Sequence, residues 1–217
     1  DCMDYSFCTT DPKILNINKK YKISYIPNPV DKSLDDMRVF ENSNPEYDLF
    51  FAMSHGVHRG ILKKGKYDER EKIINKIINK NPNLKFNIFG MNNMQPIWGE
   101  DFKRNLYNSK IALNLSQGKT IKYYSSDRIA QYAGNGIATL VDKKTKLDHF
   151  FNDDELIFYE TFNDLNKKLN KFLKNNKLRT KIAKKGRIKY HNEYNSKIIA
   201  NFIICKTFNI KKKFSWS

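Results

Sequence analysis

Residues suited to chemistry gather in three loops of this 217-residue chain, and each loop follows a short apolar run. The first loop, residues 54–66, is a candidate for binding phosphate, because it carries Gly56, Gly60 and Gly65 among Arg59, Lys63, Lys64 and Lys66. Glycine lets a backbone approach a ligand closely, and the cations neutralise phosphate charge. A basic loop with glycines is also common as plain surface, so both interpretations stay open. His55 and His58 have no partner ligands in the sequence pattern, and we interpret them as loop histidines.

The second loop, residues 88–99, has a different chemistry. Gly90 directly follows an apolar run, and Met91, Met94 and Trp98 alternate with Asn and Gln. Such a loop can hold a flat nucleobase by stacking and by amide hydrogen bonds, so Gly90 and Met91 are candidates for nucleoside binding. The alternative is a loop packed down by its own apolar side chains.

The third segment, residues 114–136, gives the strongest indication of an anion site. Ser125, Ser126 and Asp127 stand at the start of a predicted helix, whose unpaired N–H groups and dipole favour negative charge. Arg128 and Lys122 add positive charge beside them. In the alternative interpretation, Ser126 or Asp127 only caps the helix and Arg128 forms a surface ion pair.

The elements that position these loops alternate in periodicity. Short β-rich apolar runs predict strands at 47–53, 85–89, 111–115, 136–141 and 156–159. Helical patterns lie between them, at 66–81 with a capping box of Asp68 and Glu71, at 100–109, at 126–135 and, as a short helix, at 144–151. The alternation predicts an α/β fold, a Rossmann-like parallel sheet with helices on both faces. Ligands of such sheets bind beyond the carboxyl ends of the strands, where the three loops lie.

The two ends of the chain depart from this alternation. Extra C-terminal helices are predicted at 161–175, 177–194 and 195–208, with Asn163 and Asn195 as caps. Residues 1–45 contain one extended run at 22–26, then a turn and a polar stretch. We interpret 1–45 as the tail of a preceding N-terminal domain with a linker, and 46–217 as the Rossmann-like domain.

Composition and net charge limit the classes of binding partner. The formal net charge is +17 and the pI is about 9.6, which attracts nucleic acid, anionic membrane or phosphorylated ligands. Coding bias toward Lys, Asn and Ile is the alternative explanation. No apolar run is long enough to span a membrane, the first residues have neither the basic flank nor the apolar stretch of a signal peptide, and the three cysteines have no CxxC spacing. We therefore expect a cytoplasmic protein, with peripheral contact to the inner face of an anionic membrane as a further expectation.

The order of these signals resembles a known family. It consists of the basic glycine loop, a strand ending in FG, SKIALNLS, a helix ending in AxxG before a strand, and DELIFYETFNDLNKKLNKFL. This order resembles the C-terminal, nucleotide-sugar-binding domain of GT-B glycosyltransferases of group 1, especially the bacterial spore-maturation-like set. YIPNPVD, residues 25–31, is similar to the strand and turn that lead from the N-terminal domain into the second domain.

The resemblance implies roles for particular residues. The loop from Gly56 to Lys64 would face the donor diphosphate, with Arg59 or Lys64 as the basic pair, and Gly90 would begin the nucleobase-side loop. Ser125, Ser126 and Asp127 would lie beside the diphosphate. Where the family has a Glu that binds the donor ribose, this chain has Gln131, which can accept or donate a hydrogen bond but carries no charge.

The functional hypothesis is transfer of a sugar from a nucleotide-sugar, with the acceptor side and any catalytic base supplied by a missing N-terminal domain. No two aspartates have Asp-x-Asp spacing, so we expect no essential metal and no cofactor besides the donor substrate. The alternative is a non-catalytic Rossmann-like module that binds RNA or an anionic surface through its Lys-rich helices. We expect no specific nucleic acid, because those helices lack interleaved aromatic residues for base stacking.

Overall fold

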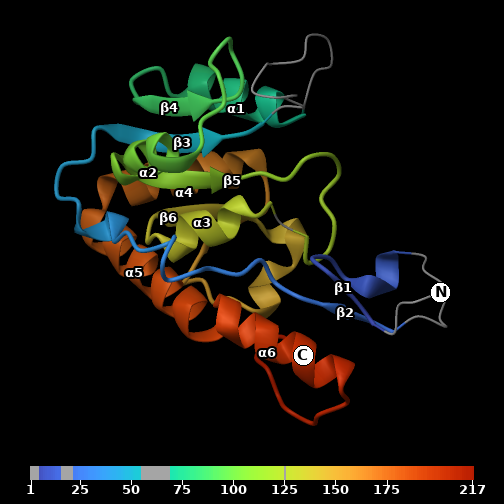
Figure 1. Cartoon of the computed structure of the whole chain (residues 1–217). Helices are drawn as coiled ribbons and strands as arrows, with labels where there is room; N and C mark the ends of the chain where they lie inside the picture. The colour runs from blue at the N-terminus through green and yellow to red at the C-terminus, as the bar shows by residue number, and fades with distance from the viewer. Residues whose placement is uncertain (1–4, 16–21, 55–68, 125) are drawn as a thin grey trace.

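The computed structural model describes residues 5–15, 22–54, 69–124 and 126–217, and its centre is a five-stranded parallel sheet. The strand order is β4-β3-β5-β6-β7 (Figure 1). The strands are β3 (Tyr47–Ala52), β4 (Phe86–Phe89), β5 (Ser109–Asn114), β6 (Ala138–Asp142) and β7 (Ile157–Tyr159). The predicted Rossmann-like α/β sheet is confirmed, and each predicted strand agrees with the structure to within about two residues.

Alternation along β3 shows how the sequence builds two cores. Leu49 and Phe51 pack into the core on one face of the sheet, whereas Phe50 and Ala52 pack into the core on the other. All four side chains are buried. Successive side chains of a strand point to opposite faces, so an apolar strand of this kind requires helices on both sides.

Helices cover both faces. On one face lie α1 (Glu69–Lys80) and α4 (Phe162–Lys174), which bring Ile74, Ile77 and Leu169 to the core. On the other lie α2 (Gly99–Tyr107) and α3 (Arg128–Gly134), as Figure 1 shows. The long α5 (Asn176–Glu193) contacts both α3 and α4.

Three local predictions are corrected or fall outside the described chain. Instead of one helix at 144–151 there are two 3-10 turns, η3 (Lys143–Thr145) and η4 (Leu147–His149), because Lys146 between them adopts a left-handed conformation with φ 57°. Helix α4 is capped by Thr161 rather than Asn163, since the Thr161 hydroxyl accepts the Asp164 N–H at 3.2 Å. The capping box of Asp68 and Glu71 cannot be placed, because residue 68 lies outside the described residues.

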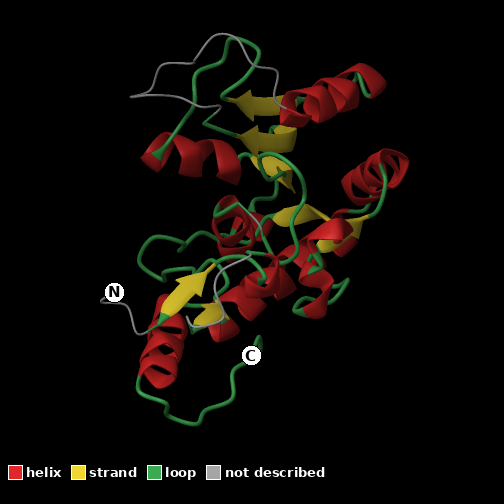
Figure 2. Cartoon of the chain, turned by 90° about the vertical axis from the view of Figure 1, so that its right-hand side faces the viewer, coloured by secondary structure: helices red, strands yellow, loops and turns green. Residues whose placement is uncertain are grey.

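The N-terminal segment forms a small sheet of its own. Strands β1 (Ser6–Cys8) and β2 (Ile23–Tyr25) pair in parallel, and they lie beside α6 (Ser196–Thr207), where Phe7 contacts Phe202 with ring centroids 6.1 Å apart (Figure 2). The 3-10 turn η1 (Pro12–Ile14) follows β1. The extended run at 22–26 is confirmed as β2, whereas β1 was not predicted. The Asn195 cap is also confirmed, because its side chain accepts the Ile198 N–H at 3.1 Å.

The linker between β2 and β3 is bound closely to the rest of the molecule. Val30 is fully buried and exchanges backbone hydrogen bonds with Tyr194 and Ser196 at the α5–α6 junction. A Cβ at Gly134 would lie 2.4 Å from Val30 Cγ1, so the linker can cross α3 only because residue 134 is glycine. The turn η2 (Val39–Glu41) then leads into β3. In the described part of the chain, no helix is both long and apolar enough to cross a bilayer.

Candidate functional site

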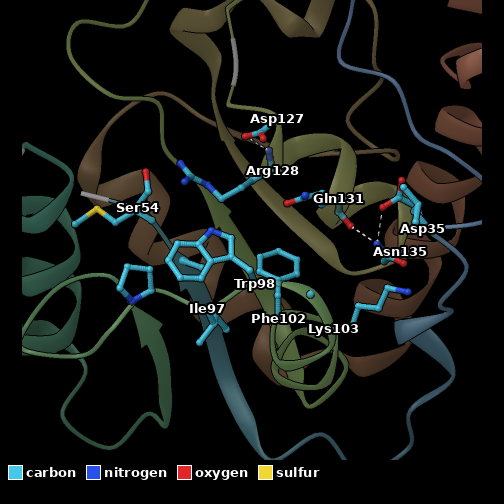
Figure 3. A pocket seen from close by; sticks show the side chains of 15 residues that line it. Asp35, Ser54, Ile97, Trp98, Phe102, Lys103, Asp127, Arg128, Gln131 and Asn135 are labelled. Carbon is cyan, nitrogen blue, oxygen red and sulfur yellow. Dashed lines mark hydrogen bonds between the residues drawn. The ribbon is translucent and has the colours of Figure 1, made fainter. Parts of the chain in front are cut away.

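A cavity of about 300 Å³ opens between the carboxyl ends of β3 and β5, the helices α2 and α3, and the linker (Figure 3). Strand order reverses at this point, since the chain passes from β3 to β4 on one side and then to β5 on the other. Ligands of open α/β sheets bind at such switch points. The lining residues are Leu34, Asp35, Ala52, Met53, Ser54, Pro96, Ile97, Trp98, Gly99, Phe102, Lys103, Asp127, Arg128, Gln131 and Asn135.

Among the described residues, two cations line the cavity, and of these Lys103 lies near the carboxylates of Asp36 and Glu100, whereas Arg128 does not pair in this way. Its Nη2 donates to the Leu115 carbonyl at 2.8 Å, and its guanidinium carbon lies 5.6 Å from the centre of the Phe51 ring. Its Nε is buried without a hydrogen-bond partner among the described residues. The guanidinium points toward the side of the cavity where Ser54 and Trp98 lie (Figure 3). A fixed, incompletely paired guanidinium can bind an anion at little cost in side-chain entropy.

The opposite side of the cavity carries amides and a carboxylate. Asn135 Nδ2 donates to Asp35 Oδ1 at 2.9 Å and to the Gln131 carbonyl at 2.8 Å, and Asp35 Oδ2 accepts the Asp31 N–H at 3.0 Å. Burial raises the pKa of Asp35, and the hydrogen bonds from Asp31 and Asn135 partly offset this rise. The Gln131 side chain points into the cavity (Figure 3). Together these groups can bind hydroxyls.

Aromatic rings form the wall between the two polar sides. Trp98 is 58% exposed although it borders the cavity, and Phe102 stacks on Tyr132 with parallel rings 6.2 Å apart. Burial raises the pKa of the Tyr132 hydroxyl to about 12, with the charge of Arg128 acting in the opposite direction. The Tyr132 ring is therefore a neutral structural support, whereas Trp98 offers a free face for stacking.

The structure places only some of the predicted site residues. Asp127, Arg128 and Gln131 line the cavity. Gly56, Arg59, Lys64 and Ser125 lie outside the described residues, so their predicted positions stay predictions. Ser126 lies just before α3, with its hydroxyl 3.1 Å from Asp127 Oδ1, but it does not line the cavity.

The N-terminus of α3 differs from the expected anion site in one respect. The Asp127 side chain itself accepts the Arg128 N–H at 3.0 Å and caps the helix. The carboxylate thus occupies the first N–H of a seven-residue helix, which leaves the Arg128 guanidinium as the group best placed to meet an anion.

Met91 and Lys122 are directed away from the cavity. Met91 is 1% exposed and packs in the sheet core, so its side chain is not available to a nucleobase in this conformation. Gly90 has φ 83° and approaches so closely that a Cβ there would lie 1.7 Å from the Met53 carbonyl oxygen. Lys122 pairs with Asp11 at 2.7 Å instead of adding charge beside Arg128.

Several lining residues were not among the predicted ones. Ser54 lies two residues after β3, at the start of the first candidate loop, and its place after a strand was a usable signal. Asp35 and Lys103 had no signal in the sequence pattern, because they reach the cavity only through the path of the linker and the packing of α2. In the described part of the chain, no three His, Cys, Asp or Glu side chains are grouped so that they could hold a metal ion.

Comparison with known proteins identifies the family. The model of a family described as "Glycosyl transferase-like" matches residues 69–204, which is more than half of the chain. The chain belongs to this glycosyl transferase-like family. Among curated protein sequences none matches the chain.

Solved structures agree on the fold. One is a TarM variant from S. aureus in a complex with Fondaparinux, alpha-GlcNAc-glycerol and UDP, with a TM-score of 0.65 at 14% identity. The match covers 95% of this chain and 44% of the TarM chain. Sucrose-phosphate synthase from Thermosynechococcus elongatus has a TM-score of 0.58 at 12% identity and covers 90% of this chain and 55% of its own. The chain thus has the Rossmann-like fold of a GT-B glycosyltransferase domain, and it spans about half the length of these proteins.

Proposed function

We propose that this chain forms the donor-binding half of a glycosyltransferase, whose cavity holds a nucleotide-sugar. The observation that carries this proposal is the Arg128 guanidinium, fixed by the Leu115 carbonyl at the carboxyl ends of β3 and β5. Family membership supports sugar transfer, and the TarM complex with UDP supports a nucleotide donor.

The reaction would break the bond between the anomeric carbon of the sugar and the diphosphate, and the diphosphate would leave with the bonding electrons. A nucleophilic atom of the acceptor would form the new bond to that carbon and give up its proton to a base. Arg128 would stabilise the negative charge that develops there, because a preorganised cation in a site with little water favours the charged leaving group. A metal ion is not part of the proposal, since the sequence has no Asp-x-Asp pair. Trp98 would stack on the base, while Gln131 would hydrogen-bond the ribose hydroxyls.

The acceptor and any catalytic base would come from an N-terminal domain that precedes this chain. The small β1–β2 sheet against α6 supports this arrangement, because it is separate from the central five-stranded sheet. The isolated chain should therefore bind nucleotide without transferring sugar.

The proposal is tested by measuring thermal stabilisation and calorimetric binding with UDP, GDP and CMP. At least one nucleotide should bind, and Arg128→Ala should weaken its binding by about tenfold or more, since a charge-assisted hydrogen bond contributes about 1.5 to 3 kcal/mol.

Arg104→Ala is the matched control, because Arg104 lies on the neighbouring helix, is exposed and pairs with Asp101 at 2.6 Å. It should leave nucleotide binding unchanged. Equal affinity in both variants, or no nucleotide binding by the unaltered chain, would contradict the proposal. Arg128→Gln, which keeps a donor for the Leu115 carbonyl, separates the loss of charge from a loss of folding.

A further inference from the structure

A second cationic surface lies at the far end of the molecule, on the loop after α6. Residues 207–213, with the sequence TFNIKKK, are all exposed. Phe208 is 71% exposed, and Ile204 and Ile210 beside it are about half exposed. Figure 1 shows this loop as the red end of the chain beyond α6, away from β3, β5 and α3. We call residues 204–213 the C-terminal loop surface.

This loop is held in a defined conformation. Asn209 adopts φ 55°, the Ile210 N–H bonds the Cys205 carbonyl at 2.8 Å, and the Asn209 N–H reaches the Lys206 carbonyl at 3.5 Å. This pattern is a Schellman motif, which ends a helix with a fixed turn. After the loop, Phe214 and Trp216 are buried against Phe202, with ring centroids 5.0 and 5.3 Å from it. The apolar side chains are therefore presented to solvent by a loop fixed at both ends.

Among the described residues, the charged side chains that line the hollow beside Ile210 are all lysines. Lys206, Lys211, Lys212 and Lys213 line a wide, open hollow of about 820 Å³ together with Lys22. Tyr5, Cys205, Asn209 and Ile210 complete the lining, so none of the lining residues in the described part of the chain is acidic. The sequence from Tyr194 to Ser217 likewise contains no Asp or Glu.

We propose that the C-terminal loop surface binds the surface of an anionic lipid bilayer, with Phe208 and Ile210 entering the interface and the lysines contacting the lipid headgroups. Exposed apolar side chains mark an interaction site, and the surrounding charge selects the partner. An acidic lipid surface complements both features, because it attracts lysines and accepts apolar side chains at its boundary. The lysines on α4 and α5 have no comparable exposed aromatic side chain beside them.

The experiment is co-sedimentation of the chain with vesicles of phosphatidylcholine alone or of phosphatidylcholine mixed with phosphatidylglycerol. Binding is expected to the mixed vesicles only, and it should fall as salt is raised. Replacing Lys211, Lys212 and Lys213 by Gln should weaken binding at least about tenfold, because each lysine near an anionic surface contributes about fivefold. Phe208→Ala combined with Ile210→Ala should weaken it about threefold or more.

Matched controls remove the same groups elsewhere. Lys174, Lys177 and Lys184 are exposed on α4 and α5, and their replacement by Gln removes the same charge. Ile121→Ala with Ile188→Ala removes two similarly exposed apolar side chains. Both controls should keep vesicle binding within about twofold, and melting curves should show that all variants are folded.

Three outcomes would overturn the proposal. Equal losses in the lysine variant and its control would show unspecific attraction by net charge. Binding to heparin or RNA with the same affinity, unaffected by Phe208→Ala, would show a site for soluble polyanions. Concentration-dependent dimers in light scattering, abolished by the Phe208 and Ile210 variant, would show that a second copy of the chain covers this surface. Nucleotide binding is measured in the same variants, so failure here leaves the proposed donor site untouched.

Discussion

The cavity and the C-terminal loop surface combine the same two chemical groups in different ways. Each places an exposed aromatic side chain near cations, Trp98 near Arg128 in one and Phe208 near the lysines in the other. In the cavity the cation is a guanidinium fixed by a carbonyl, and the aromatic ring lies on a facing wall. On the loop the cations are exposed ammonium groups on mobile stems, and the aromatic ring projects into solvent.

The difference shows that net charge alone does not locate a binding site. A fixed guanidinium in a hollow suits a small anion, because its planar set of donors matches the geometry of phosphate. Burial has also already removed part of the water around the guanidinium. Exposed lysines around an apolar tip suit an extended surface, where affinity depends on the number of charges rather than on their orientation. In our two proposals, positive charges of this chain, whose net charge is +17, therefore bind a nucleotide at one place and a lipid surface at another.

The largest expected effect follows from Gly134→Ala, which tests whether the linker is needed for the cavity. The new methyl group would meet Val30 Cγ1 at 2.4 Å, and such overpacking costs about 1 to 3 kcal/mol of unfolding free energy. The displaced linker would carry Leu34 and Asp35 out of the cavity wall, so nucleotide affinity should fall while vesicle binding stays constant. Chemical denaturation and calorimetry measure both effects.

Adding Val30→Ala to Gly134→Ala provides the control. Removing the Val30 methyl groups leaves room for the new one, so the double variant should be more stable than the sum of the single effects by about 1 kcal/mol or more. Simple additivity would show that the contact between α3 and the linker does not limit stability.

This dependence on the linker also explains what the sequence could and could not predict. The five strands were predictable because runs such as YDLFFAM are apolar on both faces, which only a covered parallel sheet can satisfy. Asp127 and Arg128 were predictable as neighbours because they stand at the start of a helix, whereas Gln131 was expected only from the resemblance to the family. Asp35 was not, because its hydrogen bond to Asn135 joins residues 100 positions apart and depends on the path of the linker over Gly134.

Short elements stabilised by tertiary contacts were missed for a related reason. Strand β1 has only three residues, and it exists through its pairing with β2 and the contact of Phe7 with Phe202. For Met91 the sequence left two interpretations open, because an apolar residue in a loop can either face a ligand or turn into the core, and local pattern does not distinguish the two. Here the close approach of Gly90 to the Met53 backbone accompanies a loop whose Met91 side chain is buried in the core.

An intermediate effect is expected from Trp98→Ala. This variant tests whether Trp98 contacts only the nucleotide, as distinct from Phe208, which we expect to contact only the lipid. Loss of stacking should weaken nucleotide binding about twofold to tenfold, since an aromatic pair contributes about 0.5 to 1.5 kcal/mol. Vesicle binding should not change. Tyr107→Ala, at the opposite end of helix α2, removes another exposed ring that does not line the cavity, and it should affect neither ligand. A loss of vesicle binding in Trp98→Ala would show that the two surfaces are not separate.

The smallest expected effect concerns Asp31. This residue connects the linker, which borders the cavity, to α6, which precedes the C-terminal loop surface. Hydrogen bonds from the Ser33 hydroxyl and N–H, and then from the Ser196 hydroxyl, lower the pKa of Asp31 from its ordinary 3.8 to about 2. Because the pKa is lower in the folded chain, the charged carboxylate stabilises the fold above pH 3.8, and this contribution is lost as the pH falls through about 2. Thermal melting from neutral to acidic pH should therefore show Asp31→Asn less stable than the unaltered chain. The difference in melting temperature between the two should narrow below pH 3.8.

The control, Ser33→Ala with Ser196→Ala, removes the donors instead of the acceptor. Its difference in melting temperature from the unaltered chain should narrow over the same pH range. A difference in melting temperature that stays constant down to pH 2 would show that these hydrogen bonds do not hold the linker to α6.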